Sequence, residues 1–162
     1  MRTRVLASAV VGAVCVAGVS VAIGQSVPKG DPGALSAVLT GAKEVDAQTL
    51  KKGGGDSDGF GSATAIASGK RLCYSILVRG IKKPVAAHIH RGGSSAAGPV
   101  VINLKQPKAG GAGFSGACIT PKGKEATAFK TLKSSPRGFY FNVHTSDHPG
   151  GAIRGQISAK KR

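Results

Sequence analysis

The chain has 162 residues, enough for one domain and a targeting segment. Its 23 Lys and Arg residues against 7 Asp and Glu give a formal charge of +16, so the protein should adhere to polyanions. The basic residues are scattered, however, Trp is absent, and only 4% of the residues are aromatic, which argues against a base-stacking platform. We therefore predict a solvated basic surface and no specific nucleic-acid site.

The N-terminus has the pattern of a secretory signal peptide. Two arginines precede a long uncharged run, which ends at the small residues Ala22 and Gly24 as a cleavage site requires. A membrane anchor is the alternative, but the run is only weakly apolar because it is rich in Gly, Ala and Ser. We predict a signal peptide at 1–24, a linker at 25–33, and a secreted or extracytoplasmic protein with no membrane span after cleavage.

Cleavage at this point would remove Cys15 and leave Cys73 and Cys118. One pair of cysteines in an exported domain predicts a disulfide. Closing the long loop between them would stabilise the fold by roughly 4 kcal/mol. The alternative is two separate buried thiols.

From Ala34 onward, short apolar or alternating runs are separated by Gly, Pro and Ser, a pattern typical of all-β proteins. The polar, Gly-rich segment 45–59 predicts a long loop. The segment 124–136 has apolar residues at helical spacing and ends at Ser-Pro, so we expect one short helix near 124–134. Strands are expected at 34–41, 60–68, 71–80, 86–92, 99–105, 114–120, 139–145 and 151–158, which together predict a sandwich or barrel.

All four histidines lie in two short clusters, "AAHIHRGG" (86–93) and "FNVHTSDHPGG" (141–151). Because side chains alternate along a strand, His88 and His90 should share one face. Their imidazoles can converge on one ion, and His144 from another strand would complete a three-nitrogen site that suits copper or zinc. His148 follows in a turn and is expected to face solvent.

The same alternation places Asn142, Arg154 and Gln156 on the face opposite the apolar core residues. That face would stay wet unless the loop 45–59 or the loop 91–98 covers it. The alternative to a metal site is therefore a hydrogen-bonded polar layer that pins a covering loop, in which Arg154 pairs with carbonyl groups or an Asp.

An ordered series of motifs runs through the chain: "LTGAKEV" (39–45), "RLCYSILV" (71–78), "AAHIHRG" (86–92), "GPVVINL" (98–104), "FYFNVHT" (139–145) and "PGGAIRGQI" (149–157). This series resembles the CHRD domain, the module named for its occurrence in chordin. One departure is Asp46, where the family usually has Pro. The resemblance implies an antiparallel Greek-key β-sandwich at 34–158, followed by a basic tail at 159–162, and a binding or interaction module, since CHRD domains have no agreed biochemical activity.

CHRD domains in turn resemble, more distantly, the sandwich of Cu/Zn superoxide dismutase. That family carries copper on a His-x-His strand with a further His from a late strand, and an Arg near its C-terminus guides the anion. The likeness implies His88, His90 and His144 as copper ligands and Arg154 as an anion-guiding residue, with a structural role for Arg154 as the alternative. The bridging His and the zinc loop of the dismutase have no counterpart here, so metal binding is more strongly implied than superoxide chemistry.

No catalytic residue is predicted, because the sequence offers neither a nucleophile with a base nor a carboxylate pair near the histidines. We expect an exported CHRD-type binding module whose candidate cofactor is a single copper ion. Its partner would be an unidentified protein or an anionic cell-envelope polymer. Two alternatives are a copper-dependent oxidoreductase of the dismutase type and a basic adhesive domain for anionic wall polymer or lipid.

Overall fold

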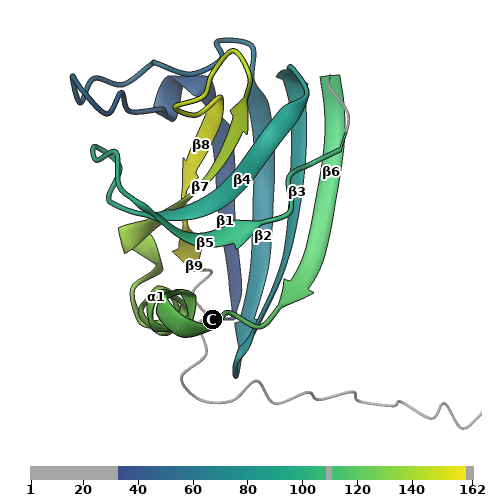
Figure 1. The fold of residues 1–162 in the computed structure, drawn as a ribbon, viewed down its shortest axis with the longest axis vertical. Coiled ribbons are helices and arrows are strands. Elements are labelled where there is room, and N and C mark those ends of the chain that lie inside the picture. The colour runs from purple at the N-terminus through teal and green to yellow at the C-terminus, as the bar shows by residue number, and fades with distance from the viewer. Residues whose placement is uncertain (1–32, 109–110, 160–162) are drawn as a thin grey trace, which may run out of the picture.

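The computed structural model describes residues 33–108 and 111–159 (Figure 1). The predicted signal peptide, nearly all of the predicted linker and most of the basic tail lie outside the described residues. Within those two ranges, no helix is both long and apolar enough to cross a membrane.

Each predicted strand and the predicted helix form, with small shifts at their ends. The last predicted strand is divided at Ile157 into two shorter ones, and short 3-10 turns follow β1 and α1, at Gly41–Lys43 and Pro136–Gly138. The elements are β1 (Ala34–Thr40), β2 (Phe60–Ser68), β3 (Arg71–Ile81), β4 (Pro84–Arg91), β5 (Val100–Leu104), β6 (Gly111–Ile119), α1 (Gly123–Ser134), β7 (Phe139–Thr145), β8 (Ile153–Gln156) and β9 (Ser158–Ala159).

The strands form one antiparallel sheet in the order β5-β4-β7-β8-β1-β2-β3-β6, with β9 beside β1. Strands β8 and β1 are joined through a single residue pair, Thr40 and Arg154. The sheet curls there, so that its two halves face each other (Figure 1). The chain passes between the halves after β3, β5 and β6, as in Greek-key sandwiches. The prediction of an all-β, sandwich-like fold with one short helix is confirmed.

The core lies between the two halves because every second residue of the strands is apolar. In β1, Leu35 and Leu39 are fully buried, and in β7 Phe141 and Val143 are fully buried on the facing half. Each such side chain contributes about 1.5–3 kcal/mol through removal of apolar surface from water. Helix α1 closes one end of the core with a single apolar stripe, formed by Ala128, Phe129 and Leu132.

Cys73 of β3 and Cys118 of β6 form the predicted disulfide. The two residues are direct partners in the β3–β6 ladder, with their Cα atoms 3.9 Å apart. They lie on the outer face of the sheet, where Cys118 is exposed. The disulfide therefore ties together two neighbouring strands that 45 residues separate in sequence.

Strand β7 is buried along its whole length, on both faces. One face carries phenylalanines into the core, and the other carries Tyr140, Asn142 and His144. That second face is covered by loops: the backbone of the loop after β4 accepts hydrogen bonds from side chains beneath it, and Glu44, which follows β1, lies against Asn142. The sequence predicted that this polar face would need a covering loop. In the structure it is covered both by the loop after β4 and by the segment that follows β1.

Candidate metal centre

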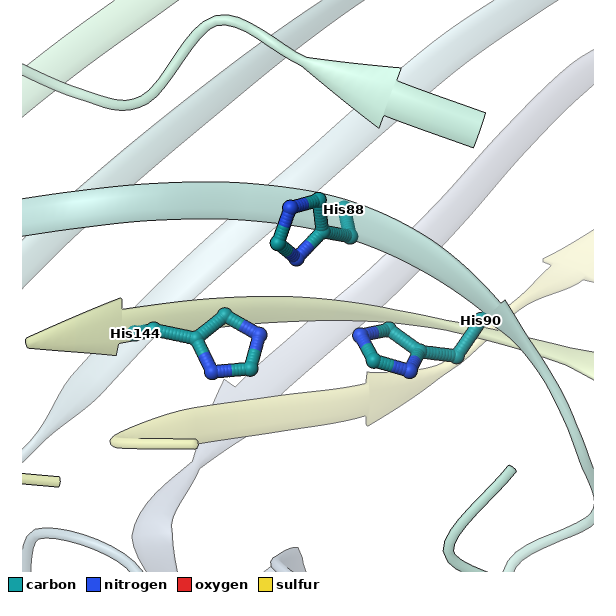
Figure 2. Close-up of side chains that lie close together, drawn as sticks. All are labelled: His88, His90 and His144. Atoms are coloured by element: carbon teal, nitrogen blue, oxygen red, sulfur yellow. The ribbon is translucent and has the colours of Figure 1, made fainter. Parts of the chain in front are cut away.

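The register between β4 and β7 brings three histidines together. His88 is paired with Asn142, and two residues along, Ala86 is paired with His144. Paired residues of antiparallel strands share a face, so His88, His90 and His144 project to the same side of the sheet. Figure 2 shows their rings turned toward one another. The ring centroids are 5.0 Å apart for His88 and His144, 5.6 Å for His88 and His90, and 5.7 Å for His90 and His144.

Two of the rings are oriented by backbone carbonyl groups. The Nδ1 atom of His90 lies 2.9 Å from the oxygen of Gly98, and Nδ1 of His144 lies 2.9 Å from the oxygen of Pro149. Because a carbonyl oxygen can only accept, each Nδ1 carries the proton, and each Nε2 keeps its lone pair. This arrangement is the usual one for histidines that bind metals, in which the second ring nitrogen donates to a carbonyl or carboxylate.

One further nitrogen of each ring is buried and has no hydrogen-bond partner among the described residues. These nitrogens are Nδ1 of His88 and Nε2 of His90 and of His144. One nitrogen from each ring lies within 4.8 Å of the others. Nitrogens bound to the same ion lie at most about 4.2 Å apart, twice the metal–nitrogen bond length. Small ring rotations would therefore bring the three onto one ion.

Burial lowers the pKa of all three imidazoles, because the charged form loses its hydration. The pKa of His90 falls to about 4, with desolvation as the main cause and the neighbouring His144, His88 and Arg154 adding to it. The rings are therefore neutral near pH 7, which is the form that binds a metal. Three imidazoles suit copper or zinc and leave a further coordination position open.

Arg154 supports the cluster from the neighbouring strand β8. Its side chain is 2% exposed, and it donates hydrogen bonds to the carbonyl oxygens of Ala96 (2.8 Å) and Gly93 (2.7 Å). The guanidinium carbon lies 3.4 Å from the centroid of the Tyr140 ring, and Tyr140 is stacked on His90 with centroids 4.9 Å apart. Arg154 thus holds both the covering loop and the aromatic ring that packs on a candidate ligand.

His148 lies outside the cluster. Its side chain is 28% exposed, and its Nδ1 is 3.7 Å from a carboxylate oxygen of Asp147. That carboxylate also accepts a hydrogen bond from Thr145 and pairs with Lys82; the hydrogen bond from Thr145 is the main reason why the pKa of Asp147 is lowered to about 2. The turn 146–151 is therefore organised around Asp147, and it reaches the histidine cluster through the backbone oxygen of Pro149.

The sequence did not single out Glu44, yet this residue is buried beside the cluster. It is 4% exposed, its Oε2 lies 3.5 Å from Nδ2 of Asn142, and its Oε1 has no partner among the described residues. Burial raises its pKa to about 8, although Arg154 and Asn142 act in the opposite direction. The contact with Asn142 spans 98 positions of the sequence, so no local pattern around Glu44 could have revealed its burial.

The fold and the site together define a class of protein. It is an antiparallel β-sandwich in which loops cover a histidine cluster on β4 and β7, on the face opposite the core. The family model of the CHRD domain matches residues 35–157, and the chain belongs to the CHRD-domain family, as the motifs in its sequence predict. No curated protein matches the sequence significantly.

Proposed function

We propose that this chain is an exported interaction module of the CHRD type that binds one copper ion through His88, His90 and His144. The observation that carries this proposal is the set of three buried ring nitrogens, which face one another and lack hydrogen-bond partners in the described part of the chain. Copper would be held by these rings, and any chemistry at its open position would come from the ion itself.

A purely structural polar layer accounts less well for these nitrogens. A buried polar atom without a partner costs about 1–3 kcal/mol, and native proteins leave few of them. Here each of three clustered rings has such an atom, one nitrogen of each ring lies within 4.8 Å of the others, and Gly98 and Pro149 orient two of the rings through their other nitrogen. A bound ion would satisfy all three atoms at once.

The environment of Arg154 favours binding over turnover of an anion such as superoxide. An anion-guiding Arg must be accessible to the anion, whereas Arg154 is 2% exposed and is held in place by the hydrogen bonds that its two terminal nitrogens donate to loop carbonyls. Its strong contacts with the loop support a positioning role. A binding module is therefore the better supported function, and the dismutase-type oxidoreductase is the weaker alternative.

Two features support a position outside the cytoplasm. The disulfide between Cys73 and Cys118 is of a kind that persists in oxidising compartments, and the N-terminal sequence has the pattern of a signal peptide. We infer that the partner is an extracytoplasmic protein or an anionic envelope polymer.

The test is a copper titration of metal-free protein against a chelator of known affinity, with circular dichroism to check folding. The wild type should bind one Cu²⁺, with an electron paramagnetic resonance spectrum typical of nitrogen ligands. His88→Ala/His90→Ala should weaken binding by at least about 100-fold, the effect expected when ligands are lost. His148→Ala is the matched control and should bind like the wild type. Equal affinity of the double variant and the wild type would overturn the proposal.

A further inference from the structure

A cavity of about 230 Å³ lies next to the histidine cluster. It is enclosed by the segment 44–48 after β1, by Ala97 and Gly98 of the loop after β4, and by the turn at Gly150 and Gly151. His90, Tyr140 and Asn142 also line it, so the cavity touches the candidate metal centre without including His88 or His144 among its lining residues.

Two residues that line the cavity each carry a buried oxygen atom with no hydrogen-bond partner among the described residues. These atoms are Oε1 of Glu44, in a residue 4% exposed, and Oδ1 of Asn142, in a residue 2% exposed. A carboxylate or amide oxygen is an acceptor. An occupant that satisfies both atoms must therefore donate two hydrogen bonds into this corner of the cavity.

The charge of the cavity wall is opposite to that of the whole protein. Glu44 and Asp46 contribute carboxyl groups, and no Lys or Arg occurs among the described residues that line the cavity, in a chain with 23 basic residues and 7 acidic ones. The basic group whose charge acts on Glu44 is Arg154, and each of its two terminal nitrogens donates a hydrogen bond to a loop carbonyl. Burial raises the pKa of Glu44 to about 8, so this group is mostly protonated near pH 7 without an occupant, and a cation bound beside it would favour the ionised carboxylate.

Gly151 packs closely against the side chains of Glu44 and Asn142. A Cβ atom at this position would lie 2.6 Å from Oε1 of Glu44 and 2.7 Å from Nδ2 of Asn142, and the φ angle of +139° is one that L side chains rarely adopt. A glycine is thus required where the cavity meets the carboxyl group.

We propose that this cavity binds a primary ammonium group, which donates N–H bonds to Glu44 Oε1 and Asn142 Oδ1. A neutral alcohol would supply the donors without the charge, and a quaternary ammonium ion would supply the charge without the donors. The matching group occurs in two sources, a small free amine and a lysine side chain of a peptide. The proposal is independent of copper binding, because neither oxygen belongs to a candidate metal ligand.

The test uses metal-free, full-length protein in a chelator, so that it stands apart from the copper titration. Butylamine is titrated at pH 8 while the amide signals of Glu44 and Gly151 and the side-chain amide of Asn142 are followed by NMR. We expect saturable shifts with butylamine, and at least about tenfold weaker binding of 1-butanol and of tetramethylammonium. This comparison needs no variant; equal responses to all three probes, or none, would mean that the cavity holds only water and would overturn the proposal.

Variants then test whether the bound ammonium group contacts Glu44. Glu44→Gln keeps the shape of the side chain and should weaken butylamine binding about tenfold or more, whereas Glu125→Gln on α1 is the matched control and should not change it. Retention of wild-type affinity by Glu44→Gln would also overturn the proposal. Nα-acetyl-lysine methylamide distinguishes the sources: tighter binding than butylamine assigns the site to a lysine side chain, and weaker binding assigns it to a free amine.

Discussion

The Nδ1 atom of His90 donates a hydrogen bond to the carbonyl oxygen of Gly98, 2.9 Å away. The strand β4 carries the ring, and the loop that follows the same strand fixes its orientation. That loop is in turn held from β8, where Arg154 binds the carbonyl groups of Gly93 and Ala96. The orientation of a candidate ligand therefore depends on a side chain that is not itself a ligand.

Arg154→Lys should destabilise the protein and weaken copper binding. Lysine keeps the charge but lacks the planar fork that reaches two carbonyl groups at once, so a buried charge would lose part of its pairing. We expect a loss of about 2–4 kcal/mol in the free energy of unfolding, measured by urea denaturation, together with reduced copper affinity under conditions where the variant is folded. Arg71→Lys, at an exposed position at the start of β3, is the control. An unchanged urea midpoint for Arg154→Lys would contradict the structural role.

Strand alternation in the sequence was enough to place the histidines on one face and the apolar residues on the other. Ile89 and Val143 are fully buried in the core, as predicted, and His88, His90 and His144 lie together on the opposite side. Alternation is a local property of an extended backbone, so it can be read from a short segment. It does not specify which strands are neighbours.

The sequence predicted a covering loop and carbonyl partners for Arg154, but which atoms contact each histidine depends on the tertiary structure and could not be predicted. The pairing of β4 with β7 joins segments that β5, β6 and α1 separate along the chain. Likewise Gly98, Pro149 and Glu44 reach the cluster only because the loops fold back over this face. Loops of this composition have no periodic pattern, and therefore their contacts leave no signal in the sequence.

The metal-free protein should lose stability in acid through its histidines. In the native state the pKa of His90 is lowered from 6.5 to about 4, so between these values the unfolded chain binds a proton that the native protein does not. The free energy of unfolding therefore falls as the pH decreases through this window, by on the order of 3 kcal/mol from this residue. Urea midpoints between pH 7 and pH 4 should show a smaller fall for His90→Gln, with His148→Gln as control. Parallel curves for wild type and His90→Gln would contradict the burial of this ring.

Glu44 should have the opposite effect on stability at higher pH. Its pKa is raised from 4.5 to about 8, so between these values the native protein holds a proton that the unfolded chain has lost. The contribution of Glu44 to the free energy of unfolding is therefore fully present below pH 4.5. It is lost as the pH rises through 8, with a slope of up to about 1.4 kcal/mol per pH unit. Glu44→Gln should therefore gain stability relative to the wild type between pH 5 and pH 8, whereas Glu125→Gln should not. A constant difference across this range would show that Glu44 is ionised in the native state.

The disulfide should account for a large part of the stability of this small domain. It closes a loop across 45 residues, for which loop entropy predicts about 4 kcal/mol. Cys73→Ala/Cys118→Ala should lower the melting temperature, and dithiothreitol should lower that of the wild type to a similar value, because Cys118 is exposed to the reductant. The double variant is its own control, since the reductant should leave it unchanged. A loss of less than about 1 kcal/mol would mean that β3 and β6 pair equally well without the bond.

Adhesion to an anionic polymer, if it occurs, should follow the charge of the surface and not the histidine cluster. Exposed lysines occur in pairs at 51–52 and 82–83, within a chain of formal charge +16. Screening lengths fall from about 10 Å at 0.1 M salt to 3 Å at 1 M, so binding to immobilised polyphosphate should weaken steeply as salt is raised. Lys82→Glu/Lys83→Glu should weaken it further, whereas His88→Ala/His90→Ala should not. Retention that resists salt but requires copper and the two histidines would instead link partner binding to the metal centre.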